Sequence, residues 1–119
     1  MAEITANGYQ SLRGFIQSTW KYIELRDGSG TPIIRLSPSD QRVTWTHQAG
    51  NQTLELTIVV KGSDADLASA LPKTFAQSAI FDVASGGSPY SVETYTAFTM
   101  ETSMDELTVK HQIQVPQVV

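Results

Sequence analysis

Two histidines are the side chains of this sequence best suited to chemistry. His47 alternates in register with Trp45. His111 does the same with Val109 and Ile113, so both imidazoles could point into the interior of a β fold and meet there. A pair of imidazoles offers a metal site or a switch near neutral pH. Because no third ligand clusters with them, we favour hydrogen-bonded histidines at a core edge or a subunit interface, and we expect no metal site.

Acidic and glycine-rich segments are the next candidates. Asp64 and Asp66 resemble the opening of a calcium loop, but the glycine and the bidentate glutamate of an EF-hand are missing, so a solvated turn is the better interpretation. Gly86-Gly87 has no Lys-Ser/Thr after it and is interpreted as a turn. A hairpin loop explains Asp105-Glu106 without glycosidase chemistry. We therefore expect no catalytic residue and no cofactor, and we predict that the protein is not an enzyme.

Three aromatic residues, Trp20, Trp45 and Tyr90, could form a flat contact surface. Such a platform stacks on sugars or bases, whereas packing in a core or an interface is the more frequent use of these side chains. A carbohydrate-binding β-sandwich is therefore kept as an alternative function.

Composition excludes several classes of protein. The chain has 119 residues, no Cys and a net charge of -4, so it has room for one domain with a core of its own and cannot form disulfides, thiol nucleophiles or Cys-based zinc sites. The negative charge disfavours nucleic acid as a partner. Residues 58–60 are the longest aliphatic run, far below the roughly 20 residues of a membrane span, so we expect no membrane partner.

The elements that would position these residues are mostly strands. A helix is predicted at the start, where Thr5 could cap a segment in which Tyr9, Leu12, Phe15 and Ile16 form one apolar stripe. From Trp20 onward the period changes to two. Strands are predicted over residues 20–26, 32–36, 43–47, 53–60, 75–83, 92–100 and 107–115, with at most one helical turn near 67–72.

Seven short strands joined by Gly/Pro turns predict a mainly β protein, an antiparallel β-sandwich (Ig-like or jelly-roll-like) with one short N-terminal helix. We expect a single domain over residues 1–119. Residues 1–18 would be an N-terminal arm and helix, 19–115 the sandwich, and 116–119 a C-terminal tail.

Three segments resemble a class of small bacteriophage virion proteins and the collar-like N-terminal domains of some phage tail fibres. The first is the opening ITANGYQSLR at residues 4–13, and the second is the strand and Gly-rich turn WKYIELRDGSG at 20–30. The third is SAIFDVASGG at 78–87, followed by YTAF at 95–98 and the closing DELTVKHQIQV at 105–115. The resemblance spans nearly the whole chain and carries over no catalytic residue.

The resemblance implies a structural protein of the virion, assembled in the cytoplasm of a bacterial host. A capsid decoration or cement subunit, which stabilises the shell by protein-protein contacts, is the first choice, and a tail or tail-fibre adaptor is the alternative. The implied partners are copies of the chain itself, in a homo-oligomer such as a trimer, and a larger virion protein such as the major capsid protein or a tail component.

Assembly contacts are expected at the two ends of the chain. Residues 1–8 and 116–119 could add to the sheet edge of a neighbour, a geometry that satisfies backbone groups with little side-chain specificity. The contact residues predicted in this way are Ile4, Thr5, Tyr9, Pro116, Val118 and Val119.

Overall fold

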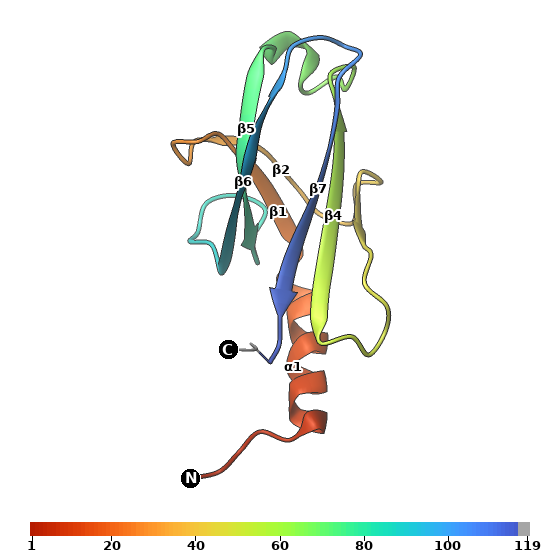
Figure 1. Ribbon diagram of the computed structural model, residues 1–119, viewed down its shortest axis with the longest axis vertical. Coiled ribbons are helices and arrows are strands. Elements are labelled where there is room, and N and C mark those ends of the chain that lie inside the picture. Colours follow the sequence, from red (N-terminus) through yellow and green to blue (C-terminus); the bar gives the residue numbers. More distant parts are fainter. Residues whose placement is uncertain (117–119) are drawn as a thin grey trace.

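The computed structural model describes residues 1–116, which form two antiparallel sheets and one N-terminal helix (Figure 1). The molecule measures 53 × 27 × 24 Å, and the helix extends from one end of the sheets along the longest axis. The prediction of a mainly β antiparallel sandwich is confirmed. Its elements are α1 (Ala6–Thr19), β1 (Tyr22–Arg26), β2 (Pro32–Leu36), β3 (Val43–Trp45), β4 (Thr53–Lys61), β5 (Lys73–Phe81), β6 (Ser91–Met100) and β7 (Glu106–Gln114).

One sheet has the strand order β2-β1-β5-β6 and the other β3-β4-β7. The inner faces of both sheets contribute to one buried apolar cluster, because every second residue of each strand points the same way. In β4 the predicted alternation is exact, since all of its buried side chains lie two residues apart. They are Leu54, Leu56, Ile58 and Val60. β4 pairs with β7 over its full length, with Thr53 opposite Gln114 and Lys61 opposite Glu106.

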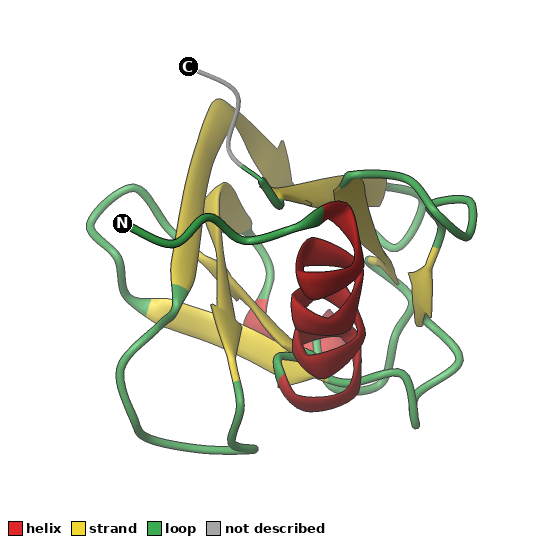
Figure 2. Cartoon of the chain, turned by 90° about the horizontal axis from the view of Figure 1, so that it is seen from below, coloured by secondary structure: helices red, strands yellow, loops and turns green. Residues whose placement is uncertain are grey.

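Helix α1 begins as predicted. The Thr5 hydroxyl accepts a hydrogen bond of 3.2 Å from the backbone N–H of Gly8, which is the usual role of an N-cap residue. At the other end, the N–H of Trp20 donates to the carbonyl of Ile16. Figure 2, seen from the helix end, shows α1 in front of the two sheets.

The predicted apolar stripe of the helix is only partly buried. Ile16 is the buried residue of α1, whereas Leu12 and Phe15 are 42% and 59% exposed. Only one edge of the helix packs on the sandwich, because α1 extends beyond the ends of the strands (Figure 1).

Several strand boundaries differ from the prediction by one or two residues. β3 ends at Trp45, so His47 lies beyond the sheet, and β5 begins two residues earlier than expected. The predicted helical turn before β5 is a 3-10 turn at Ala68–Ala70. It lies with the 101–105 turn at the end of the molecule opposite to α1 (Figure 1).

Candidate functional site

Exposed apolar side chains gather at the N-terminal end of the described chain. Of the eight large apolar residues that are exposed, four belong to the first fifteen residues. These are Met1, Ile4, Leu12 and Phe15. Their concentration on one projecting segment makes this end of the molecule the candidate interaction surface, since scattered single residues would need no explanation.

Contacts of Arg13, Ile16 and Gln17 fix α1 to the sandwich and decide which side faces solvent. The Arg13 guanidinium donates to the carbonyl of Val115 at the end of β7, and Ile16 packs in the core. Leu12 and Phe15 are three residues apart, so they lie together on a neighbouring side of the helix. Arg13 is also the sole charged residue among the fourteen of α1. The side of the helix that carries Leu12 and Phe15 is therefore exposed, apolar and uncharged.

The predicted assembly residues have different roles. Ile4 is exposed, and its Cγ2 lies so close to Gly8 that a Cβ there would be 2.8 Å away. Thr5 caps the helix, while Tyr9 and Pro116 are half-buried. Val118 and Val119 lie outside the described residues.

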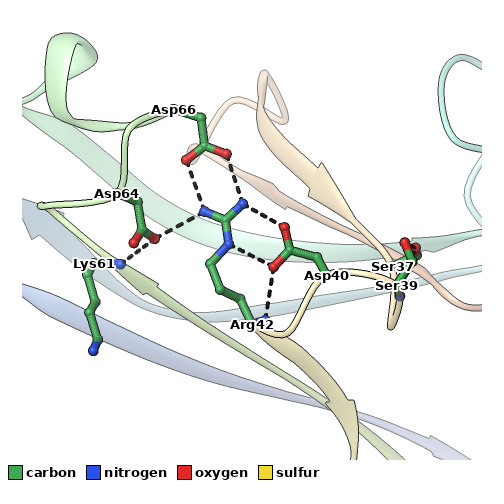
Figure 3. Close-up of polar contacts among 7 residues, drawn as sticks. All are labelled: Ser37, Ser39, Asp40, Arg42, Lys61, Asp64 and Asp66. Atoms are coloured by element: carbon green, nitrogen blue, oxygen red, sulfur yellow. Dashed lines mark hydrogen bonds and ion pairs between the residues drawn. The ribbon is translucent and has the colours of Figure 1, made fainter.

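A second polar feature joins Arg42 to three carboxylates (Figure 3). Its guanidinium makes paired hydrogen bonds of 2.9 and 3.0 Å with Asp40 and of 2.9 Å with Asp66, and one of 3.1 Å with Asp64. All five N–H donors of Arg42 are therefore engaged. These bonds lower the pKa of Asp40 to about 2, chiefly through the side-chain hydrogen bond from Arg42, and raise the pKa of Arg42.

The segment with Asp64 and Asp66 is a turn, as interpreted, and Arg42 pairs with both of its carboxylates. Asp64 also accepts from the backbone N–H of Lys61, so it closes the turn after β4. An open groove of about 590 Å³ lies beside the cluster, but Arg42 has no free donor for an anion. Within residues 1–116, no group of three or more His, Asp or Glu side chains is arranged to hold a metal ion.

A third polar cluster covers the outer face of the four-stranded sheet, and sequence reasoning missed it. Glu24 is 3% exposed and binds Arg26 at 2.6 Å and Arg35 at 2.9 Å. The Arg35 guanidinium lies 3.5 Å from the ring centroid of Phe81 and also donates to the carbonyls of Val83 and Gly86. Arg35 thus holds the loop after β5 against the sheet, which is a structural use of charge.

The two histidines do not meet. His111 is fully buried, with Nδ1 2.7 Å from the Ser78 hydroxyl and Nε2 2.8 Å from the Ser91 hydroxyl. The Nδ1 of His47 instead accepts from the backbone N–H of Glu55, and its Nε2 lies 3.2 Å from the Gln17 side chain. Each imidazole is hydrogen-bonded, but in its own place, because His47 lies beyond the end of β3.

The three aromatic residues are not one platform. Trp20 and Tyr90 stack with ring centroids 4.8 Å apart and an interplanar angle of 9°, whereas Trp45 meets His47 edge-on. Both tryptophans are partly buried against the core. Tyr90 is the exposed member, and the nearby charge of Asp82 raises its pKa. One face of Trp20 is therefore already covered by Tyr90.

The expected turns are present. Gly86 and Gly87 have φ angles of 68° and 74°, which favour glycine in this turn. The Asp105 carboxylate accepts hydrogen bonds from the backbone N–H groups of Glu101 and Thr102, which hold the β6-β7 connection and lower the pKa of Asp105. This acidic segment therefore has a structural role, as expected, but it is not a hairpin loop: β6 and β7 belong to different sheets, so it connects the two sheets.

No helix in the described part of the chain has the length and hydropathy needed to cross a membrane. Comparison with known proteins adds no relative: no family model, no curated protein and no solved structure matches this chain.

Proposed function

We propose that this protein is a non-enzymatic structural subunit of a bacteriophage virion, in first place a capsid decoration or cement protein. The resemblance of the sequence to small phage virion proteins supports the assignment to a virion. The structural support is the exposed apolar surface on α1, formed around Leu12 and Phe15. Burying such a side chain completely is worth about 1.5 to 3 kcal/mol, so a partner that covers this surface gains binding energy from it.

The sandwich supports this role by holding the helix in place. An isolated helix of fourteen residues with two glycines would be marginal in water. Ile16 and the Arg13-Val115 contact order the helix before any partner arrives, which lowers the entropy cost of association. A subunit that joins many neighbours benefits from a contact surface that is already folded.

A tail or tail-fibre adaptor is the second candidate, and the shape of the molecule favours it. The long axis of 53 Å is about twice either other axis, with α1 at one end and the 101–105 turn at the other. An adaptor must offer two separate contact regions, and opposite ends of an elongated molecule provide them. Both placements use the helix end for assembly.

Separating purified virions of the encoding phage into heads and tails tests the proposal. Peptide mass spectrometry would locate this chain and give its copy number relative to the major shell protein. Hundreds of copies with the heads support decoration, and a small number with the tails supports the adaptor. Absence from both fractions would overturn the virion role and return attention to carbohydrate binding at the Trp20-Tyr90 stack.

A further inference from the structure

We propose that the exposed side of helix α1 is a self-association surface, whose partner is the same helix in a second copy of this chain. The inference rests on the proposed assembly function and names the partner for it. The contact residues would form a helical stripe, defined here as the α1 stripe. They are Thr5, Gly8, Leu12, Phe15 and Thr19.

The spacing of the α1 stripe predicts a helical partner. Its successive members are separated by three, four, three and four residues, which is the a/d spacing by which two helices pack along a common seam. Two other residues of α1, Arg13 and Ile16, already face the sandwich. The helix thus has one side for its own domain and an adjacent side, with coiled-coil spacing, on which Leu12 and Phe15 are exposed.

Charge favours a second copy as the occupant. The protein has a net charge of -4, so most of its surfaces repel a copy. The α1 helix contains no acidic residue, and its one cation, Arg13, is engaged at the Val115 carbonyl. Two α1 stripes can therefore approach each other with no like charges in opposition. We take the two helices to be parallel, so Leu12 and Phe15 of one copy meet Leu12 and Phe15 of the other along the two-fold axis.

Both threonine hydroxyls of the stripe already form a hydrogen bond inside the helix. The Thr5 hydroxyl accepts from Gly8, and the Thr19 hydroxyl donates to the Phe15 carbonyl at 2.6 Å. The O–H donor of Thr19 is therefore paired before any partner covers it, which lowers the cost of burying this residue. Gly8 adds a position without a side chain, close to Ile4 and Thr5 of the same chain.

Sedimentation velocity of the full chain over a range of concentrations tests the inference. The unmodified protein is expected to self-associate reversibly. The double variant Leu12→Gln/Phe15→Gln should raise the dissociation constant by at least about tenfold, because two buried apolar contacts become polar. Met104→Gln is the matched control: Met104 is 89% exposed and belongs to the 101–105 turn, which lies at the end of the molecule opposite to α1 (Figure 1), so its loss should leave the association unchanged. Circular dichroism would verify that each variant keeps its fold.

Cross-linking provides a second readout, since the natural chain has no Cys. A Leu12→Cys variant should form a disulfide dimer on oxidation, because equivalent stripe positions face each other. Gln10→Cys, which is exposed on the opposite side of α1, should not.

A protein that is monomeric at all concentrations and forms no Leu12→Cys dimer would overturn the inference. Association that persists in the folded double variant would also overturn it, by placing the interface elsewhere. Neither result affects the virion role, which fails only if the chain is absent from heads and tails. The two proposals can therefore fail separately.

Discussion

The Nδ1 atom of His111 lies 2.7 Å from the hydroxyl of Ser78, and this hydrogen bond joins β7 of one sheet to β5 of the other through the middle of the core. The hydroxyl of Ser91 on β6 lies 2.8 Å from the second ring nitrogen, Nε2. The imidazole thus has a partner at each nitrogen but no carboxylate, so nothing in contact with it compensates a positive charge. Burial accordingly lowers the pKa of His111 to about 4.

The stability of the protein should depend on pH through His111. In the unfolded chain this residue takes up a proton below its ordinary pKa of 6.5, whereas in the folded protein it stays neutral down to about 4. The proton therefore favours unfolding, and the free energy of unfolding should fall by about 3 kcal/mol as the pH drops through this window. Urea denaturation at a series of pH values would measure the change.

The variant His111→Gln is the control for this prediction. It should be less stable than the natural protein at neutral pH, yet its stability should vary less between about pH 6.5 and 5. Asp40 acts at lower pH, since its pKa of about 2 means that its stabilisation is lost only below its ordinary value of 3.8. An unchanged slope in the variant would show that another group is responsible.

Glu24→Gln should destabilise the protein by about 3 kcal/mol. The substitution leaves Arg26 and Arg35 beside a neutral amide. Removing one partner of a buried ion pair destabilises the folded protein because the remaining charge is buried without compensation. Glu106→Gln makes the same chemical change at an exposed position and should alter the free energy of unfolding by less than about 0.5 kcal/mol. Equal effects in urea denaturation would contradict the structural role of Glu24.

Arg42→Met should reduce the free energy of unfolding by about 1 to 2 kcal/mol. Without the guanidinium, Asp40, Asp64 and Asp66 face one another, but their partial exposure allows water to screen the repulsion. The pKa of Asp40 should rise from about 2 toward its ordinary value, which an NMR titration would detect. Arg42→Lys should lose less stability, because it keeps the charge without the paired geometry. A pKa of Asp40 that does not move would contradict this account.

Two glycines should respond in opposite ways to alanine. A Cβ at Gly62 would lie 1.9 Å from the carbonyl oxygen of Thr102, so Gly62→Ala must displace the 101–105 turn and should cost about 2 to 3 kcal/mol. A Cβ at Gly14 meets nothing within 4 Å. Gly14→Ala should therefore stabilise the helix by up to about 1 kcal/mol. Thermal unfolding of both variants checks the pair, and a harmless Gly62→Ala would contradict the close approach of the two turns.

The regular elements could be predicted because their causes are local. β4 and β7 each place one face on the core, so the period-two pattern of their side chains is direct evidence for a strand. The helix start was predictable for the same reason, since Thr5 and the Gly8 amide it binds are three residues apart.

The polar clusters could not be predicted, because their partners are distant in sequence. Glu24 occupies the outward position of β1, and it is buried only because Arg35 and the loop after β5 cover it. The local sequence of Asp64 indicates only a solvated turn, because its partner Arg42 lies 22 residues earlier in the chain. The alternation of His47 with Trp45 was likewise misleading, since local pattern does not reveal that β3 ends at Trp45.

The Arg13-Val115 contact has a mechanical consequence. It joins the helix that leads into β1 to the end of β7, and these strands belong to different sheets. Tension between α1 and the end of β7 therefore pulls one sheet from the other, and it loads the few contacts of α1, including the Arg13-Val115 bond, first. The hydrogen-bonded strand pairs, which resist shear collectively, carry force only after the sheets begin to separate. Force applied to both segments in the same direction bypasses this weak point, so joint attachment at the helix end lets the sandwich bear load as one body.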